Sequence, residues 1–239
     1  MAGRATTTES RTRTITTVRQ SRILPRVREQ LRHDLESELD GDVRFDAITR
    51  LLYSTDASVY QIEPTGVVMV RSRDDVVRTI EIASRHGVSI TVRGGGTSQA
   101  GQAIGAGLQL DTAKYFNRLL EVNVEERWAR VEPGIVLDEL NVHLLPHGLR
   151  FAPDISTASR ATIGGMIANN SSGTRSVVYG KTIDYVDSLT VMLTDGSVVV
   201  LDDSDPATSS ADSLQIRCRD TVVRLARDHA DEIDRRYPK

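Results

Sequence analysis

The sequence predicts an α+β protein that combines a small subdomain containing a β-α-β unit with a larger, mainly antiparallel sheet subdomain flanked by helices. In residues 66–92 a buried-strand pattern, a helical pattern and a second strand pattern follow one another, an order typical of parallel strands joined by a crossover helix. After residue 118 the strand patterns face each other across short turns, which is typical of antiparallel hairpins. The change of pattern divides the fold into its two parts.

Composition excludes several classes of protein. The 239 residues include 30 Lys and Arg against 33 Asp and Glu, and the net charge of −3 gives no electrostatic case for nucleic acid or an anionic membrane. The apolar runs are far shorter than the roughly 20 residues needed to cross a bilayer. The single cysteine, Cys218, excludes an internal disulfide and any all-cysteine metal or iron–sulfur site. We therefore expect no nucleic-acid partner, no transmembrane segment and a cytoplasmic location.

Three segments are predicted along the chain. Residues 1–22 form a disordered basic tail, because residues 1–28 carry seven arginines and a single acid, and no apolar helical face develops before Ile23. The same charge and hydroxyl content resembles a mitochondrial transit peptide, so the mitochondrial matrix stays open as an alternative location, as does peripheral attachment to a membrane. Residues 23–60 form an N-terminal helical segment, and residues 61–239 form the main domain.

Local signals predict the individual elements. In the first half, helical spacing of apolar residues predicts helices over 24–39 and 46–52, and a crossover helix runs from an N-cap at Ser72 to a stop at Gly87. Strands are expected at 66–70, 88–92 and 107–111. In the second half we expect a hairpin over 119–134, a helix over 136–145, a hairpin over 188–201 that turns at Asp195-Gly196, and a helical C-terminus.

The glycine triplet of "VRGGGTSQAG" (92–101) follows a strand directly. Glycine is tolerated where the backbone needs a positive φ or something lies against it, and successive N–H groups there can bind an anion. The P-loop pattern needs a lysine, and none lies between residues 1 and 113. The dinucleotide fingerprint begins with Gly94 and Gly96 but lacks its third glycine in the required register. Thr97 and Ser98 add hydroxyl donors. The loop therefore predicts a phosphate site of another kind.

The stretch "PDISTASRATIGGMIANNSSGTRSVVYG" (153–180) predicts a second part of the same site. A short buried helix is expected to begin near Thr162, with Gly164 and Gly165 in its first turn, where a flat group or backbone could approach. The polar cluster 169–173 follows. An apolar face with a polar rim suits an isoalloxazine ring that carries a ribityl chain.

These motifs, together with "YGKTIDYVDSLTVMLTDGSVV" (179–199), closely resemble in order and spacing the FAD-binding PCMH-type domain of the vanillyl-alcohol oxidase family. The resemblance is nearest to the FAD-linked D-lactate, glycolate and D-2-hydroxyglutarate dehydrogenases and runs from about Tyr53 to Gly196. It implies that 61–239 is the FAD-binding domain of an oxidoreductase that converts a 2-hydroxy acid to the 2-oxo acid.

The resemblance also implies the roles of individual residues. The first loop would wrap the FAD pyrophosphate. The start of the short helix would lie along the flavin and ribityl chain, with Pro153 and Asp154 nearby, and the polar cluster 169–173 would complete the site. The implied FAD-binding residues are, in this order, Arg93, Gly94, Gly95, Gly96, Thr97, Ser98 and Gln99; Thr162, Ile163, Gly164 and Gly165 with Pro153 and Asp154; and Asn169, Asn170, Ser171, Ser172 and Gly173. Relatives that tether FAD covalently commonly have His where this chain has Thr97, so non-covalent FAD is expected.

Substrate and electron acceptor are less defined. The resembling enzymes continue into a cap domain that binds substrate and supplies catalytic groups, so we expect the 2-hydroxy acid to bind through a C-terminal region absent here, and we assign no catalytic residue. The electron acceptor, whether a quinone, cytochrome, flavoprotein or iron–sulfur partner, stays open. Two alternatives also stay open: a stand-alone flavin or electron-transfer module, and a reductase of the peptidoglycan-precursor type. No metal site is expected, because Pro146 interrupts the pair His143 and His147 and no carboxylate joins it.

Overall fold

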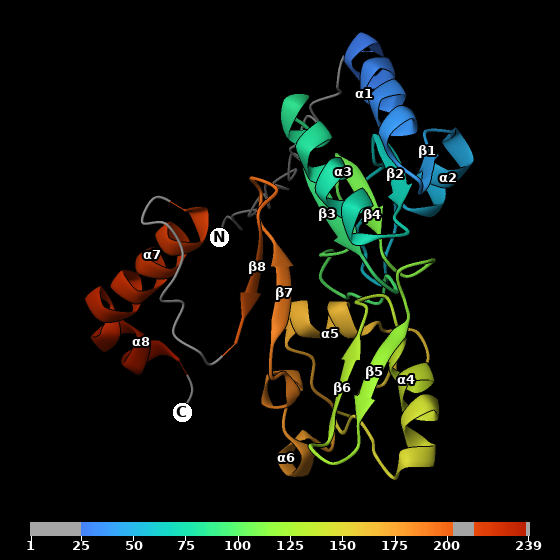
Figure 1. The fold of residues 1–239 in the computed structure, drawn as a ribbon. Helices are drawn as coiled ribbons and strands as arrows, with labels where there is room; N and C mark the ends of the chain where they lie inside the picture. Colours follow the sequence, from blue (N-terminus) through green and yellow to red (C-terminus); the bar gives the residue numbers. More distant parts are fainter. Residues whose placement is uncertain (1–24, 203–212, 238–239) are drawn as a thin grey trace, which may run out of the picture.

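The computed structural model describes residues 25–202 and 213–237. The predicted basic tail at 1–22 and the start of the helical segment 23–60 lie outside the described residues. The chain forms a mixed helix and sheet fold in which two lobes are stacked on each other, with a pair of helices beside them (Figure 1). This agrees with the α+β class that the sequence predicts.

The first lobe is built on a four-stranded sheet in the order β1-β2-β4-β3. Strands β2, β4 and β3 are parallel, and β1 pairs antiparallel with β2. The predicted β-α-β unit is confirmed, but β4 lies between the two strands that the crossover helix joins. The bounds are β1 Asp42–Arg44, β2 Gly66–Met69, α3 Arg73–Arg85, β3 Ile90–Arg93 and β4 Leu108–Asp111.

The crossover helix α3 begins and ends at the predicted residues. The Ser72 hydroxyl accepts a hydrogen bond from Asp75 N at 3.2 Å, and Gly87 has a φ of +62°. An N-cap oxygen satisfies an otherwise free N–H of the first turn, and glycine reaches the left-handed region without steric cost. Helices α1 (Pro25–Glu38) and α2 (Ala47–Leu52) also form where apolar spacing predicts them.

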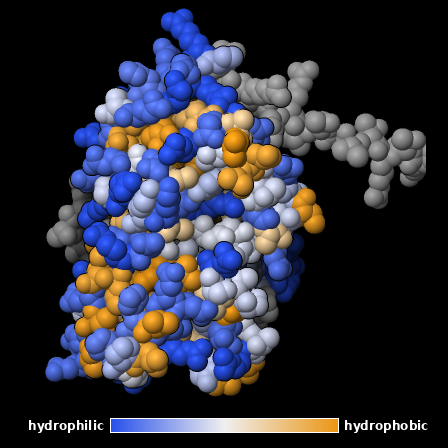
Figure 2. Space-filling view, turned by 90° about the vertical axis from the view of Figure 1, so that its right-hand side faces the viewer, coloured by the Kyte–Doolittle hydropathy of each residue, from blue (hydrophilic) through white to orange (hydrophobic). Residues whose placement is uncertain are grey.

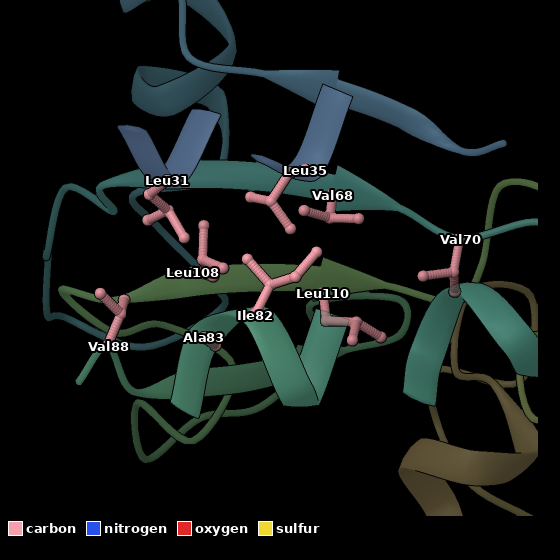
Figure 3. Packing of buried hydrophobic residues seen from close by; sticks show 9 residues of the cluster. All are labelled: Leu31, Leu35, Val68, Val70, Ile82, Ala83, Val88, Leu108 and Leu110. Carbon is pink, nitrogen blue, oxygen red and sulfur yellow. The ribbon is translucent and has the colours of Figure 1, made fainter. Parts of the chain in front are cut away.

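The core of the first lobe lies between its helices and the sheet. Leu31 and Leu35 point from α1 toward the side chains of β2 and β4, and Ile82 points into the same cluster from α3 (Figure 3). All three are completely buried. The long N-terminal helix α1 is thus part of this core.

The second lobe contains two antiparallel hairpins with short helices between them in the sequence. Gly196, which has a φ of +82°, forms the predicted turn of the second hairpin. Within the described residues, no hydrogen-bonded ladder joins the two hairpins into one sheet. The bounds are β5 Leu119–Asn123, β6 Trp128–Val131, α4 Leu137–Leu144, η1 Leu145–His147, α5 Ile163–Asn169, α6 Ser176–Tyr179, η2 Thr182–Tyr185, β7 Leu189–Met192 and β8 Val198–Leu201.

A second apolar core fixes α5, the helix that carries the predicted flavin segment. Ile163 and Met166 of α5 pack with Leu137 and Leu140 of α4 and with Ile135. Their burial leaves the opposite side of α5, where Gly165 lies, exposed. Packing therefore sets which face of this short helix a ligand can reach.

Helices α7 (Leu214–Asp228) and α8 (Ala230–Arg236) lie beside the two lobes (Figure 1). The predicted helical C-terminus is confirmed, although no residue of either helix is buried. On the face shown in Figure 2, apolar side chains form separate patches within a largely polar surface. Among the described residues, no helix has both the length and the hydropathy that crossing a membrane requires.

Candidate functional site

The glycine loop presents a row of free backbone donors. Within the described parts of the chain, the N–H groups of the six residues Gly94 to Gln99 have no hydrogen-bond acceptor. The loop leaves the sheet at the carboxyl end of β3, and Gly96 has a φ of +65°. Successive free N–H groups in such a turn form a concave site for an anion. Gly95 and Gln99 are exposed and the other four residues are half-buried. Half-buried donors without a partner are costly, so an external acceptor would complement them.

Contacts from the sheet side hold this loop in place. Arg93 Nη1 donates to Ala103 O at 3.1 Å, and Asp56 Oδ2 accepts from Ala103 N at 3.3 Å. The fully buried Gln109 side chain reaches the same turn: with its amide oriented to satisfy both groups, it donates to Ala103 O at 3.2 Å and accepts from Gly105 N at 3.0 Å. The free N–H groups therefore belong to a loop that the sheet braces.

Two of the three glycines are required by packing against the second lobe. A β-carbon built on Gly94 would lie 2.1 Å from Thr162 Oγ1, and one built on Gly95 would lie 2.1 Å from the carbonyl oxygen of Arg160. The sequence predicts a close neighbour for these glycines. That neighbour is the Arg160 backbone and the Thr162 side chain, both of which belong to the second predicted motif. The contact brings both motifs into one site.

Helix α5 begins at the predicted residue and separates its two glycines. Thr162, which is buried, accepts a hydrogen bond from Gly165 N at 3.3 Å as the N-cap. A β-carbon on Gly164 would lie 2.6 Å from the Pro133 side chain, whereas one on Gly165 would meet only Thr162 Oγ1, at 3.3 Å. Gly164 therefore admits Pro133 of its own lobe, and Gly165 is open except toward the Thr162 hydroxyl. Only the second position can admit a flat ligand.

The polar cluster after α5 is divided between the site and the fold. Asn169 Oδ1 accepts from Gln102 Nε2 at 3.4 Å, which joins the glycine loop to the end of α5. Asn170, with a φ of 45°, accepts from Ile183 N through Oδ1 at 3.1 Å, and Ser171 O accepts from Thr182 Oγ1 at 2.8 Å. Asn170 and Ser171 thus anchor η2, while Asn169 faces the loop and Ser172 is exposed.

A third contact joins the segment around Asp154 to the polar cluster. A β-carbon on Gly173 would lie 1.4 Å from Asp154 O, so the two stretches of backbone touch. Arg175 Nε donates to Asp154 Oδ2 at 2.6 Å, and this hydrogen bond holds the pKa of the Asp154 carboxyl below its ordinary value. Pro153 is buried beside them. The sequence motifs did not predict the contact of Gln102 with Asn169 or that of Arg175 with Asp154. Nothing in the sequence around these residues indicates partners so distant along the chain.

Comparison with known proteins agrees with this geometry. Residues 64–202 match the model of a family described as FAD binding domain. The chain therefore belongs to this family of flavin-binding domains, and its cofactor is FAD.

Among relatives, the chain is 40% identical over 208 residues to a D-2-hydroxyglutarate dehydrogenase of Pantoea ananatis, an alignment that covers 83% of this chain and 20% of that protein. It is 37% identical over 167 residues to the glycolate oxidase subunit GlcD of Bacillus subtilis, covering 68% of this chain and 35% of that one. A solved alkyldihydroxyacetonephosphate synthase shares the fold with a TM-score of 0.66 at 22% identity, over 80% of this chain and 40% of that one. The chain thus spans about a fifth of the length of the first of these relatives.

The residues present fit FAD. A pyrophosphate needs donors, and the loop offers six unpartnered N–H groups next to the guanidinium of Arg93. A flavin ring needs a flat approach, and the exposed side of Gly165 provides it. Both features face the junction of the two lobes, where an extended dinucleotide can contact them together.

Proposed function

We propose that this chain binds FAD non-covalently through the three segments that the sequence motifs mark. Residues Arg93 to Gln99 hold the pyrophosphate, Thr162 to Gly165 lie along the flavin and ribityl chain, and Pro153-Asp154 with Asn169 to Gly173 complete the site. The observation that carries the proposal is the row of six free N–H groups at Gly94 to Gln99. A loop of this kind binds phosphate through its backbone N–H groups and does not need the lysine of a P-loop.

Each segment has a defined task in this proposal. The loop N–H groups stabilise and orient the pyrophosphate, since charge-assisted hydrogen bonds to an anion are about twice as strong as neutral ones. The Thr162 cap keeps the first turn of α5 in place, so that Gly165 presents a surface without a side chain. When bound, FAD supplies the acceptor for the electrons removed from a substrate, and the protein contributes binding and orientation.

We further propose that the whole protein is a dehydrogenase that oxidises a 2-hydroxy acid to the 2-oxo acid. Support comes from the names of the relatives, a D-2-hydroxyglutarate dehydrogenase and a glycolate oxidase subunit, both of which are much longer than this chain. The described residues supply the flavin site; no catalytic base is assigned among them. The choice among D-2-hydroxyglutarate, glycolate and D-lactate is a matter for assay of the full-length protein.

Flavin binding is tested on the 239-residue chain by titration with FAD, followed by acid precipitation. The expected result is saturable quenching of flavin fluorescence and, after acid, all yellow colour in the supernatant, because Thr97 offers no tether. A folded chain that does not bind FAD would overturn the proposal. Colour retained in the pellet would overturn only the non-covalent part of it.

A further inference from the structure

Behind the glycine loop, Arg93 lies in a cluster with two side chains that no motif indicates, Tyr53 and Asp111. Arg93 ends β3 and Asp111 ends β4, and the two are register partners on neighbouring parallel strands. Paired positions on adjacent strands project their side chains to the same face of the sheet. An arginine and an aspartate placed in this way would ordinarily form an ion pair.

That ion pair is absent within the described residues. Arg93 has no carboxylate within 4.0 Å, and one of its donors is used on Ala103 O. Asp111, which is 7% exposed, is fully engaged elsewhere. Its Oδ1 accepts from Ala113 N at 2.6 Å and from Lys114 N at 3.2 Å, and its Oδ2 accepts from the Tyr53 hydroxyl.

Tyr53 contacts both members of the would-be pair. Its hydroxyl donates to Asp111, and its ring lies 5.2 Å from the guanidinium carbon of Arg93. Burial, followed by the hydrogen bond to Asp111, raises the pKa of the Tyr53 hydroxyl above its ordinary value, so the hydroxyl stays a proton donor. The ring offers Arg93 a cation–π contact in place of the carboxylate.

We propose that Tyr53 is a positioning residue of the FAD site: it engages the Asp111 carboxylate and thereby keeps the Arg93 guanidinium unpaired and available to the pyrophosphate. The inference rests on the proposed function, since it concerns the same anion. A guanidinium paired with a buried aspartate would be both neutralised and turned away from the loop. Arg93 instead stays beneath Gly96, whose β-carbon would lie 2.5 Å from Arg93 Nη2.

The test compares FAD and ADP binding by the full chain and its variants Y53F, D111N and Y53F/D111N. In Y53F the Asp111 Oδ2 atom loses its donor and becomes free to pair with Arg93. The dissociation constants of both ligands should then rise roughly ten- to hundredfold, the worth of a charge-assisted hydrogen bond. In the double variant the residue at 111 no longer carries the carboxylate that competes for Arg93, and both constants should return to within about threefold of the wild type. D111N alone should bind FAD as tightly as the wild type, because the amide that replaces the carboxylate could still accept from the two backbone N–H groups and donate to the Tyr53 hydroxyl oxygen.

The matched control is Y115F, which removes a similar hydrogen bond from a tyrosine that contacts neither Arg93 nor Asp111, from the Tyr115 hydroxyl to Asp42 Oδ2 at 3.0 Å. Its FAD affinity should be unchanged. Loss of FAD binding in Y53F without recovery in the double variant would assign Tyr53 a packing role and overturn the inference, as would an unchanged Y53F or a weakened D111N. A folded wild type that fails to bind FAD would instead overturn the proposed function itself.

Discussion

The two neighbouring glycines of α5, Gly164 and Gly165, have different surroundings and therefore different structural roles. Gly164 packs on Pro133 within its own lobe, whereas Gly165 is exposed and has only the Thr162 hydroxyl close to the position of a β-carbon. The sequence predicts that both admit a close neighbour but cannot say which neighbour, because helical phase alone does not reveal what packs on each face. The distinction leads to a pair of variants with opposite effects.

In G165L, the stability of the apo protein should stay within about 1 kcal/mol of the wild type, because replacing glycine inside a helix recovers about 0.5–1 kcal/mol while the new β-carbon, 3.3 Å from Thr162 Oγ1, requires a small shift of the cap. Its FAD affinity should fall at least about tenfold, because the new side chain occupies the surface proposed for the flavin. The control G164A should show the reverse, with an unfolding free energy lower by about 1–3 kcal/mol. Thermal denaturation of the apo variants measures their stability, and FAD titration measures their FAD affinity. Equal FAD affinity of G165L and the wild type would remove Gly165 from the site.

At the level of elements, the short edge strand β1 depends on one carboxylate. Asp42 Oδ2 accepts from Lys114 Nζ at 2.8 Å and from the Tyr115 hydroxyl at 3.0 Å, and Oδ1 lies 3.3 Å from Arg71 Nη2. The hydrogen bond from Lys114 contributes most to lowering the pKa of Asp42 from 3.8 to about 2, against the opposing effect of burial. Asp42 thus joins β1 to residues that follow β2 and β4.

A depressed carboxyl pKa stabilises the fold above the unfolded-state value, and this stabilisation is lost as pH falls through the folded-state value. The contribution of Asp42 should therefore be complete above pH 3.8 and disappear toward pH 2. D42N should lower the unfolding free energy near neutral pH by about 1 kcal/mol, less than the shift alone implies, because Lys114 and Arg71 are partly exposed and screened. Urea denaturation of D42N and the wild type across this pH range measures the difference in their unfolding free energies. A difference between D42N and the wild type that does not shrink on acidification would contradict the assignment.

Elements marked by local chemistry could be predicted, and those set by distant pairing could not. Ser72, Thr162, Gly87 and Gly196 act on their own turns, so their sequence signals specify helix starts, a helix stop and a hairpin. The insertion of β4 between β2 and β3, and the separation of the two hairpins, depend on which strands meet in space. Strand pairing of this kind is decided by tertiary packing, which no short window contains.

For the molecule as a whole, the candidate site is a junction between two separately packed lobes. Each lobe has its own apolar core, and the glycine loop of the first touches the segment 160–162 of the second. Gln102 and Asn169 add a side-chain contact across the same junction. The family motifs predicted which residues belong to the site, because they carry the loop and the helix start. They could not predict the bracing by Gln109 or the contact of Gln102, which arise only when the two lobes meet.

FAD that spans this junction should protect both lobes at once. In the apo chain, the N–H groups of Gly94 to Gln99 have no acceptor and should exchange with solvent deuterium rapidly. Saturation with FAD should slow exchange in this loop and in the segment from Thr162 to Gly173, because a ligand that binds only the native state stabilises it by RT ln(1 + [L]/Kd). The exposed hairpin turn at Glu125 to Arg127 serves as the internal control and should exchange equally fast with and without ligand. Hydrogen-exchange mass spectrometry resolves the three segments in one experiment. Protection confined to the glycine loop would mean that FAD contacts the first lobe alone, and the part of the proposed site on α5 would then have to be abandoned.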